Sequence, residues 1–355
     1  MSEQGRPGSA PAGRSAGNDA PEAAAGGGGA GRARPPVGVV LAVIVAVQAL
    51  LMLWFAWPAQ NTEPRDLPVV VAGPQQAAES LAARLGAAGG DAFEVTTVAD
   101  AAAADRALTD RAAYGAFIVG QGGVEVHVAS AAGPAVSTAL SQLAASLGQP
   151  GGPAVTVVDV VPTSADDPRG AGFAGSFLPL ILTSIGAGVV VALIARSRAV
   201  RVAAIAGYGL SAGLLAAGLM HWTGVLAGSY LGAATAIAML ATAIAATVAG
   251  LYALIGRAGI ALGAVLVFLI GNPLSGLAAA PELLPQPWGE VGQYLPVGAG
   301  ATLIRSAGYF DWAGATQSVA VLASYVLVGL ILVATAGIRR RRPTPTEPEP
   351  QFAAA

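Results

Sequence analysis

Hydrophobic side chains are gathered in long runs along this chain, and six of these runs predict membrane-spanning helices. The first run covers residues 37–57, where Gln48 is the only strongly polar side chain. A helix of this length, at about 1.5 Å per residue, crosses the hydrocarbon core of a bilayer, which is about 30 Å thick. The other predicted spans follow later in the chain, at about residues 173–194, 202–220, 228–255, 258–271 and 317–338.

The first run can be read as an uncleaved anchor or as a cleaved signal peptide. The apolar region of a signal peptide usually has about 7–15 residues, and small residues precede the cleavage site. Here the run is longer, and Trp57-Pro58 stands where those small residues should be. We therefore expect an uncleaved anchor, with Trp54 and Trp57 at the far membrane interface.

Residues 60–170 show a different pattern, in which short β-type runs alternate with helical stretches. The predicted order is strand, helix, strand, helix, strand, strand, helix, strand. The strands are expected at residues 67–72, 93–98, 114–119, 124–128 and 154–161. The third and fourth strands flank GQGG, which is typical of a hairpin. This pattern predicts a compact α/β domain of roughly 100 residues.

Composition agrees with a membrane protein and excludes several kinds of chemistry. Of the 355 residues, 54% are hydrophobic and only 11% are charged, against about 25% charged in soluble domains. Cysteine is absent and all 18 basic residues are arginine, which excludes disulfides, thiolate metal sites, a Walker-type ATPase and lysine Schiff bases. The net charge of −2 does not indicate nucleic-acid binding, and we expect no cofactor.

The arginines predict the orientation of the spans. Residues 1–36 and 339–355 are expected to be tails, the first disordered because it has almost no large apolar side chain. With both tails in the cytoplasm, 12 of the 18 arginines lie inside: Arg6, Arg14, Arg32, Arg34, Arg196, Arg198, Arg201, Arg257 and the four at 339–342. The fold class predicted is therefore a polytopic α-helical protein of the cell membrane, with six transmembrane helices and an extracytoplasmic α/β domain between helices 1 and 2.

The predicted spans hold no ionisable side chain but many small ones. Ion-coupled transporters keep ionisable groups at mid-membrane, so their absence argues against a self-powered transporter. A passive scaffold and a permease powered by another chain both remain open. Small residues let helix backbones approach closely, and three GxxxG pairs are candidates for such packing: Gly209 and Gly213, Gly228 and Gly232, and Gly259 and Gly263.

The fifth span is unusually short. Residues 258–271 cover only about 21 Å as a helix, and Asn272-Pro273 follows. Proline disfavours helix at the residue before it, so the helix is expected to break there. Two interpretations stay open: the break lines a gate or pathway, or the helix simply ends early.

Residues 272–315 are too long and too apolar for a solvated loop. Trp288 and other aromatic residues recur among prolines, which suits short helices at or dipping into the outer interface. Arg305 is the only cation there, with Glu282, Glu290 and Asp311 as candidate partners. Its role is a structural salt bridge or a substrate contact, and we favour the salt bridge. His127, in VEVHV, is expected with Glu125 on a solvated strand face rather than in catalysis.

The same region resembles a known family. GNPLSG at 271–276, followed by PELLPQPWGEVGQYLPVGAGATLIRSAGYF at 281–310, is similar to the ABC-2-type permease superfamily, and more closely to its YhgE/Pip-like and DUF3533-like bacterial membrane proteins. The large domain after the first span and the five further spans resemble that family too. The positions that carry the resemblance are Gly271, Asn272, Pro273, Ser275, Gly276, Pro285, Pro287, Trp288, Pro296 and Arg305.

The resemblance implies the membrane subunit of an exporter, in a homo- or heterodimer powered by a separate cytoplasmic ATPase. It also leaves open a non-transporting surface or accessory protein, such as a phage receptor or a secretion accessory, whose outer domain binds a partner. An enzyme is not expected, because the outer domain has a single histidine and no GxSxG motif. Membrane lipid is the one surrounding partner that every interpretation shares.

Overall fold

The computed structural model describes residues 36–147 and 155–335. The predicted tails, 1–36 and 339–355, fall outside the described residues apart from Pro36, and so do the arginines within them. The chain divides into two compact units, Met1–Ala49 and Leu50–Ala355. The helix α1 (Val37–Gln60) crosses this boundary, and every element after it belongs to the second unit.

Within the described residues, five helices are long and apolar enough to cross a membrane: α1 (Val37–Gln60), α5 (Ala171–Ile194), α6 (Arg198–Trp222), α7 (Tyr230–Ile255) and α11 (Thr316–Thr335). They lie at five of the six predicted positions. The remaining prediction corresponds to α8 (Arg257–Ala264) and the wide-turn π-helix η2 (Val265–Ile270), which together are shorter than the five others. The chain is therefore consistent with a polytopic helical membrane protein, with five candidate spans and one shorter apolar helix.

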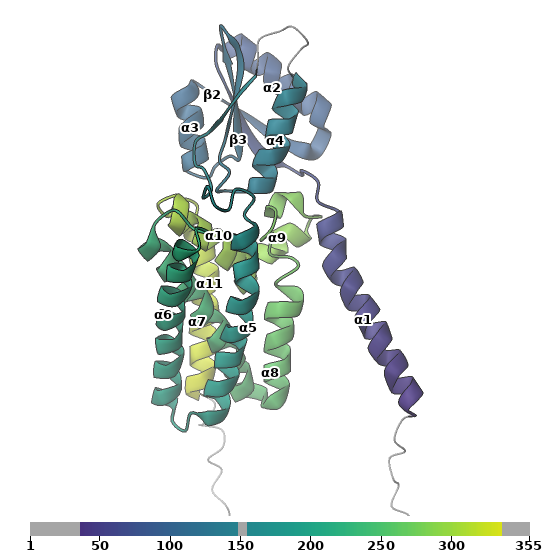
Figure 1. Ribbon diagram of the computed structural model, residues 1–355, viewed down its shortest axis with the longest axis vertical. Helices are drawn as coiled ribbons and strands as arrows, with labels where there is room; N and C mark the ends of the chain where they lie inside the picture. The colour runs from purple at the N-terminus through teal and green to yellow at the C-terminus, as the bar shows by residue number, and fades with distance from the viewer. Residues whose placement is uncertain (1–35, 148–154, 336–355) are drawn as a thin grey trace, which may run out of the picture. The chain divides into compact units, whose positions relative to one another are not determined.

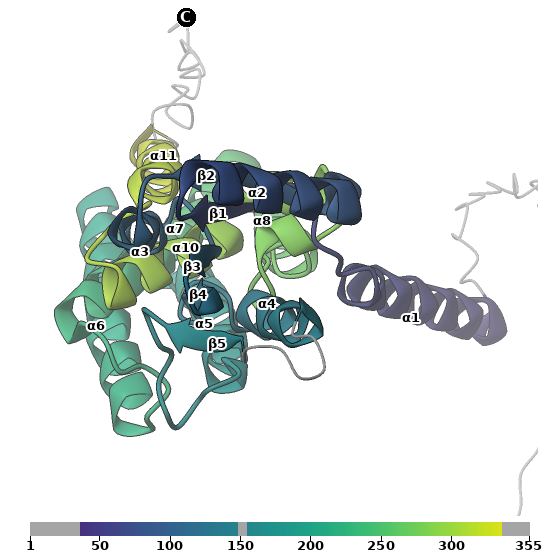
Figure 2. The same cartoon turned by 90° about the horizontal axis from the view of Figure 1, so that it is seen from above.

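The segment between α1 and α5 contains a five-stranded sheet, and its elements follow the predicted order. The strands are β1 (Leu67–Ala72), β2 (Phe93–Val98), β3 (Gly115–Gly120), β4 (Gly123–Val128) and β5 (Thr156–Asp159). Their order across the sheet is β2-β1-β3-β4-β5 (Figure 2). Only β3 and β4 pair antiparallel, through the predicted hairpin, and the other neighbours are parallel.

Helices cover both faces of this sheet. The alternation of β1 sends Leu67, Val69 and Val71 to the face covered by α2 (Gln75–Gly89) and α4 (Pro134–Leu147). Val70 and Ala72 point to the other face, against α3 (Ala101–Thr109). Figure 2 shows α3 on one side of the strands, and α2 and α4 on the other.

Burial corrects the expectation for one face of β4. Glu125 is exposed as predicted, but His127 is only 9% exposed. Its Nδ1 lies 2.6 Å from a carboxylate oxygen of Asp105, on α3. The solvated-face prediction was therefore wrong for His127, because strand alternation cannot show which helix will cover a polar position.

In the helical part, α7 lies at the centre and contacts α5, α6, α8, α10 (Pro296–Tyr309) and α11. Figure 1 shows α5, α6, α7 and α11 side by side. Glycine makes close approach possible: a side chain at Gly213 would overlap the carbonyl oxygen of Ala234 on α7. The predicted pairs all face a neighbouring backbone, with Gly209 and Gly213 against α7, Gly228 and Gly232 against α10, and Gly259 and Gly263 against α7.

Between η2 and α11 the chain forms three short helices: η3 (Pro281–Leu283), α9 (Trp288–Gln293) and α10. The sequence predicts that such helices lie at or dip into the outer membrane interface. In the structure α10 is buried almost completely within the protein, from Pro296 to Gly308. This segment also joins the sheet to the bundle, since Leu283 belongs to the apolar core on one face of the sheet and Phe310 to the core on the other.

Candidate functional site

The predicted motif begins where η2 ends. The last helical residue is Ile270, and the Gly271 N–H donates to the carbonyl of Leu266 at 3.0 Å, one residue further back than in an α-helix. Asn272 and Pro273 follow in a turn, as expected from the restriction that proline places on its neighbour. The short helix and its end at this turn agree with the sequence prediction.

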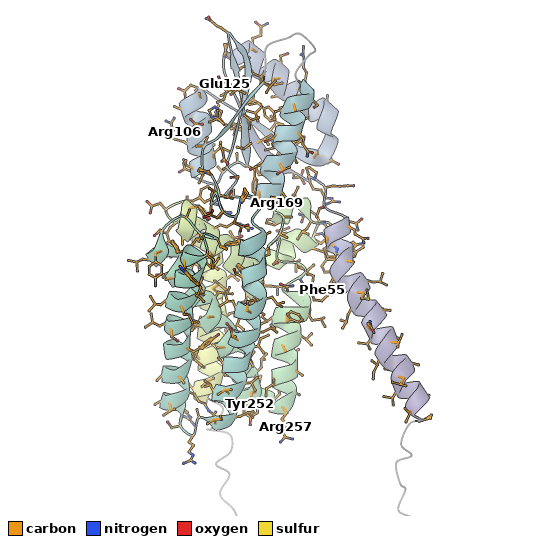
Figure 3. The ribbon with its side chains drawn as sticks, viewed as in Figure 1. Phe55, Arg106, Glu125, Arg169, Tyr252 and Arg257 are labelled. Atoms are coloured by element: carbon orange, nitrogen blue, oxygen red, sulfur yellow. The ribbon has the colours of Figure 1, made fainter. Side chains whose placement is uncertain are left out.

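A tryptophan side chain of α1 donates a hydrogen bond to a backbone carbonyl group near that helix end. The Nε1–H of Trp54 donates to the Leu269 carbonyl at 2.6 Å, and the ring of Phe55 packs on Phe268 with centroids 5.9 Å apart. Phe55 is labelled in Figure 3. Trp54 and Trp57, both expected at the far membrane interface, differ in exposure: Trp54 is half-buried against protein and Trp57 is 42% exposed. The Leu269 carbonyl, which lies at the end of the helix, therefore accepts a hydrogen bond from the Trp54 side chain.

Ser275 and Gln293 connect the turn to α9 and α10. The Ser275 hydroxyl donates to the Asn272 carbonyl at 2.7 Å and accepts from the Leu277 N–H at 3.2 Å. The Gln293 amide donates to the Ser275 carbonyl at 3.2 Å, and its oxygen accepts from Thr302 at 2.7 Å. One side chain of α9 therefore joins the turn to the middle of α10.

Close backbone contacts also hold this turn against α9 and the residues before it. Gly276 has φ +64°, which favours glycine, and its Cα faces the backbone of Pro281. A side chain at Gly292 would overlap the Leu274 carbonyl oxygen, so α9 rests directly on the turn. We call residues 271–305 the turn–helix unit, because these contacts join the turn at 271–276 to α9 and α10.

The prolines and the tryptophan of the motif have different surroundings. Pro296 is buried and opens α10, where its missing N–H costs no helical hydrogen bond. Trp288 opens α9 and is 41% exposed. Pro285 is half-buried and Pro287 is exposed. These residues shape the segment, but only Pro296 lies in the packed interior.

The salt bridge predicted for Arg305 is absent among the described residues. Arg305 is 7% exposed, and its Nη2 donates to the Leu277 carbonyl at 2.7 Å. Its guanidinium lies over the ring of Phe173, 4.7 Å from the centroid, a cation–π arrangement. Glu282, one of its three predicted partners, instead accepts a hydrogen bond from the Tyr114 hydroxyl at 2.8 Å. The prediction was wrong because a carbonyl group and an aromatic face satisfy this cation.

A cavity of about 260 Å³ lies where the turn–helix unit meets the sheet. This volume is just below the range of about 300–1,000 Å³ that is usual for ligand pockets. Its polar lining comes from the sheet-bearing segment and from the turn–helix unit. The loop before β3 contributes Arg111 and Tyr114. The turn–helix unit contributes Glu282, Gln293 and Thr302. It is the strongest candidate for a binding site because polar groups from several elements converge on it.

Arg111 is the principal cation of this cavity. Its Nη1 donates to the Thr302 carbonyl at 3.0 Å and to the Ser306 hydroxyl at 2.7 Å, and its guanidinium lies 5.1 Å from the centroid of the Phe310 ring. Burial lowers the pKa of Arg111. Burial raises the pKa of Tyr114, and the neighbouring Glu282 carboxylate raises it further. Tyr114 is thus a neutral hydrogen-bond donor at physiological pH.

Sequence reasoning missed Arg111, Tyr114, Gln293 and Thr302 as site residues. The one local signal is that Arg111 is followed by Ala112, Ala113 and a buried strand, an unusual place for a solvated arginine. None of the ten predicted motif positions lines the cavity; of its lining residues, Glu282 had been named in the sequence analysis, as a candidate partner of Arg305.

The described residues give no sign of metal chemistry or of a known relative. Within residues 36–147 and 155–335, no group of three or more His, Cys, Asp or Glu could hold a metal ion. The cavity therefore offers hydrogen bonds and charge, which suit binding. When the chain was compared with protein-family models, curated proteins and solved structures, none of the three comparisons found a match.

Proposed function

We propose that this chain is the membrane subunit of an exporter of the ABC-2 permease type, powered by a separate cytoplasmic ATPase and acting as a homo- or heterodimer. In this proposal α8 and η2 form the fifth of six passes. The sheet-bearing residues 60–170 form an extracytoplasmic domain, and both termini are cytoplasmic. The protein belongs to the cell membrane and carries out no catalysis itself.

The observation that supports this proposal best is the turn–helix unit. Its residues come from a helix that stops short, a proline turn and two short helices, and they lie against the polar cavity beside the sheet. Non-helical backbone at membrane depth is tolerated where protein or a wet cavity satisfies it. Such a place is where a substrate pathway through a helical protein can open.

The positions of arginines support the proposed orientation. Figure 3 places Arg257, which follows α7, at the opposite end of the bundle from Arg169, which precedes α5 beside the sheet. Arg196, Arg198 and Arg201 lie in the α5–α6 connection or at the start of α6. A cytoplasmic bundle end with these arginines follows the positive-inside rule.

Cysteine labelling tests this orientation directly, because the chain has no cysteine of its own. We expect Gln121→Cys, in the β3–β4 turn, to react with a membrane-impermeant maleimide in intact cells. Ala199→Cys, at the exposed start of α6, is expected to react only after the membrane is opened. Labelling of both positions in the reverse pattern would place the sheet in the cytoplasm and reject the topology.

Co-purification tests the transport function itself. We expect the full chain, solubilised from its native membranes in mild detergent, to carry an ATPase subunit that mass spectrometry identifies. ATP hydrolysis should follow the complex through size exclusion and disappear in a chain purified without that subunit. A preparation that transports no substrate and retains no ATPase from native membranes contradicts the permease proposal.

The second candidate is a non-transporting accessory protein whose sheet-bearing part binds an external partner. The specific observation that favours it is the connection between α5 and α6, which consists of residues 195–197 alone and offers little surface to an ATPase. The same purification separates the two candidates. An extracellular partner that is lost when residues 62–168 are deleted, with no ATPase in either sample, favours the accessory function.

A further inference from the structure

The charges around the cavity do not balance. Arg111 lies close to a second cation, Arg305, and to one carboxylate, Glu282, which already accepts the hydrogen bond from Tyr114. Among the described residues, no carboxylate oxygen comes within 4.0 Å of a nitrogen atom of either arginine. A buried charge without an opposite partner is costly, and a bound anion would supply that partner.

Arg111 keeps donor atoms available. Its hydrogen bonds to the Thr302 carbonyl and the Ser306 hydroxyl both use Nη1, and Tyr114 is its nearest other polar neighbour among the described residues. The Phe310 ring and the Thr302 carbonyl hold the guanidinium plane in place. An arginine fixed in this way can give two parallel hydrogen bonds to an oxyanion, such as a carboxylate or a phosphate.

The first turn of α11 adds further donors to the same cavity. Gln317 and Ser318 line it, and they belong to the N-terminal turn of α11, where the backbone N–H groups have no partner within the helix. Ser318 is only 4% exposed, and its hydroxyl forms no hydrogen bond to any described residue. A helix N-terminus favours a negative charge, so this end of α11 and Arg111 act in the same direction.

We propose that the cavity binds a singly charged oxyanion, a carboxylate or a phosphodiester, between Arg111 and the N-terminal turn of α11. Glu282 lines the cavity too and works against a second negative charge. The anion comes either free in solution or as part of a lipid headgroup, since both present the same oxygen atoms. The site is defined by the cavity alone and does not depend on the transport function.

Binding can be measured on the full chain in phosphatidylcholine nanodiscs. One arm adds sodium acetate or dimethyl phosphate at constant ionic strength, with sodium chloride as the reference. The other arm replaces part of the lipid by phosphatidylglycerol, whose headgroup is a phosphodiester. We expect the midpoint of thermal unfolding to rise in at least one arm, because a ligand that binds only the folded state stabilises it. The arm that responds identifies the source.

Three variants distinguish a binding site from a structural contact. Arg111→Gln should weaken binding by about tenfold or more, since it removes a charge-assisted bond. Glu282→Gln should strengthen anion binding by several-fold, because it removes the repulsion between one carboxylate and the bound anion. Arg106→Gln is the control, because Arg106 is an exposed arginine in the last turn of α3, near Arg111 in the sequence (labelled in Figure 3). This variant should leave anion binding unchanged.

The outcomes that overturn the proposal are equally specific. No stabilisation of the wild-type chain by either anion or by phosphatidylglycerol rejects the site. So does unchanged binding in Arg111→Gln. If Arg111→Gln does not fold, weaker binding in Glu282→Gln rejects the proposal instead. No ATPase is present in these measurements, so a negative result here does not contradict the exporter proposal. Rejection of the exporter proposal likewise does not contradict the anion site.

Discussion

Replacing Gly213 by leucine should separate α6 from α7 and destabilise the helical part of the protein by about 3 kcal/mol, at the upper end of the cost of overpacking. Even a methyl group at this position would overlap the Ala234 carbonyl oxygen and lie 2.7 Å from the Ala238 Cβ. Both partners belong to α7, which contacts most other helices of the bundle. The midpoint of thermal unfolding in detergent should fall by on the order of 5 °C or more.

The matched control is Gly207→Leu, six positions earlier on the same helix. Gly207 is exposed, and a side chain there would meet nothing within 4 Å. Leucine also has a better helix propensity than glycine by up to about 1 kcal/mol, so this variant should be neutral or slightly more stable. Equal thermal midpoints for the two variants would contradict the close packing of α6 on α7.

Local patterns were enough to predict most elements because each depends on neighbours in sequence. The short apolar run at 67–72, rich in valine, suits a strand that is covered on both faces, and β1 has the predicted bounds. The helices α2, α3 and α4 likewise occupy the predicted places in the order of elements. Long apolar runs located the five candidate spans, and the arithmetic of helix length identified the short sixth helix.

Contacts between distant parts could not be predicted in the same way. Arg111 bonds to Thr302, which is 191 positions later in the chain, and the resemblance quoted for residues 271–310 does not include Arg111. The partner of Arg305 was misidentified for the same reason: opposite charges near it in sequence were counted, while a backbone carbonyl and an aromatic ring lay nearer in space. Tertiary packing decides which polar groups meet.

The turn–helix unit shows how local and distant information combine. The sequence predicted that a short helix would break at Asn272-Pro273. Only the structure shows that Ser275, Gln293 and Thr302 then form one chain of hydrogen bonds. Since the cavity borders Gln293 and Thr302, the stability of this unit and the shape of the binding site should change together.

Replacing Gln293 by leucine should therefore destabilise the unit by about 2–4 kcal/mol. Leucine keeps much of the side-chain volume but neither donates to the Ser275 carbonyl nor accepts from the Thr302 hydroxyl. Each polar group left unpaired away from water costs about 1–3 kcal/mol. The expected result is a lower thermal midpoint together with faster hydrogen exchange of the amide groups in α9 and α10, measured by mass spectrometry.

Gln286→Leu provides the comparison, because it removes the same side chain from a solvated place in the same segment. Gln286 is exposed, with one hydrogen bond of 3.2 Å to the Pro281 carbonyl and one of 3.3 Å from the Glu290 N–H. Water can replace both partners, so this variant should lose less than about 1 kcal/mol. If the two variants lower the midpoint equally, Gln293 does not join the turn to α10, and the cavity wall must be held by other contacts.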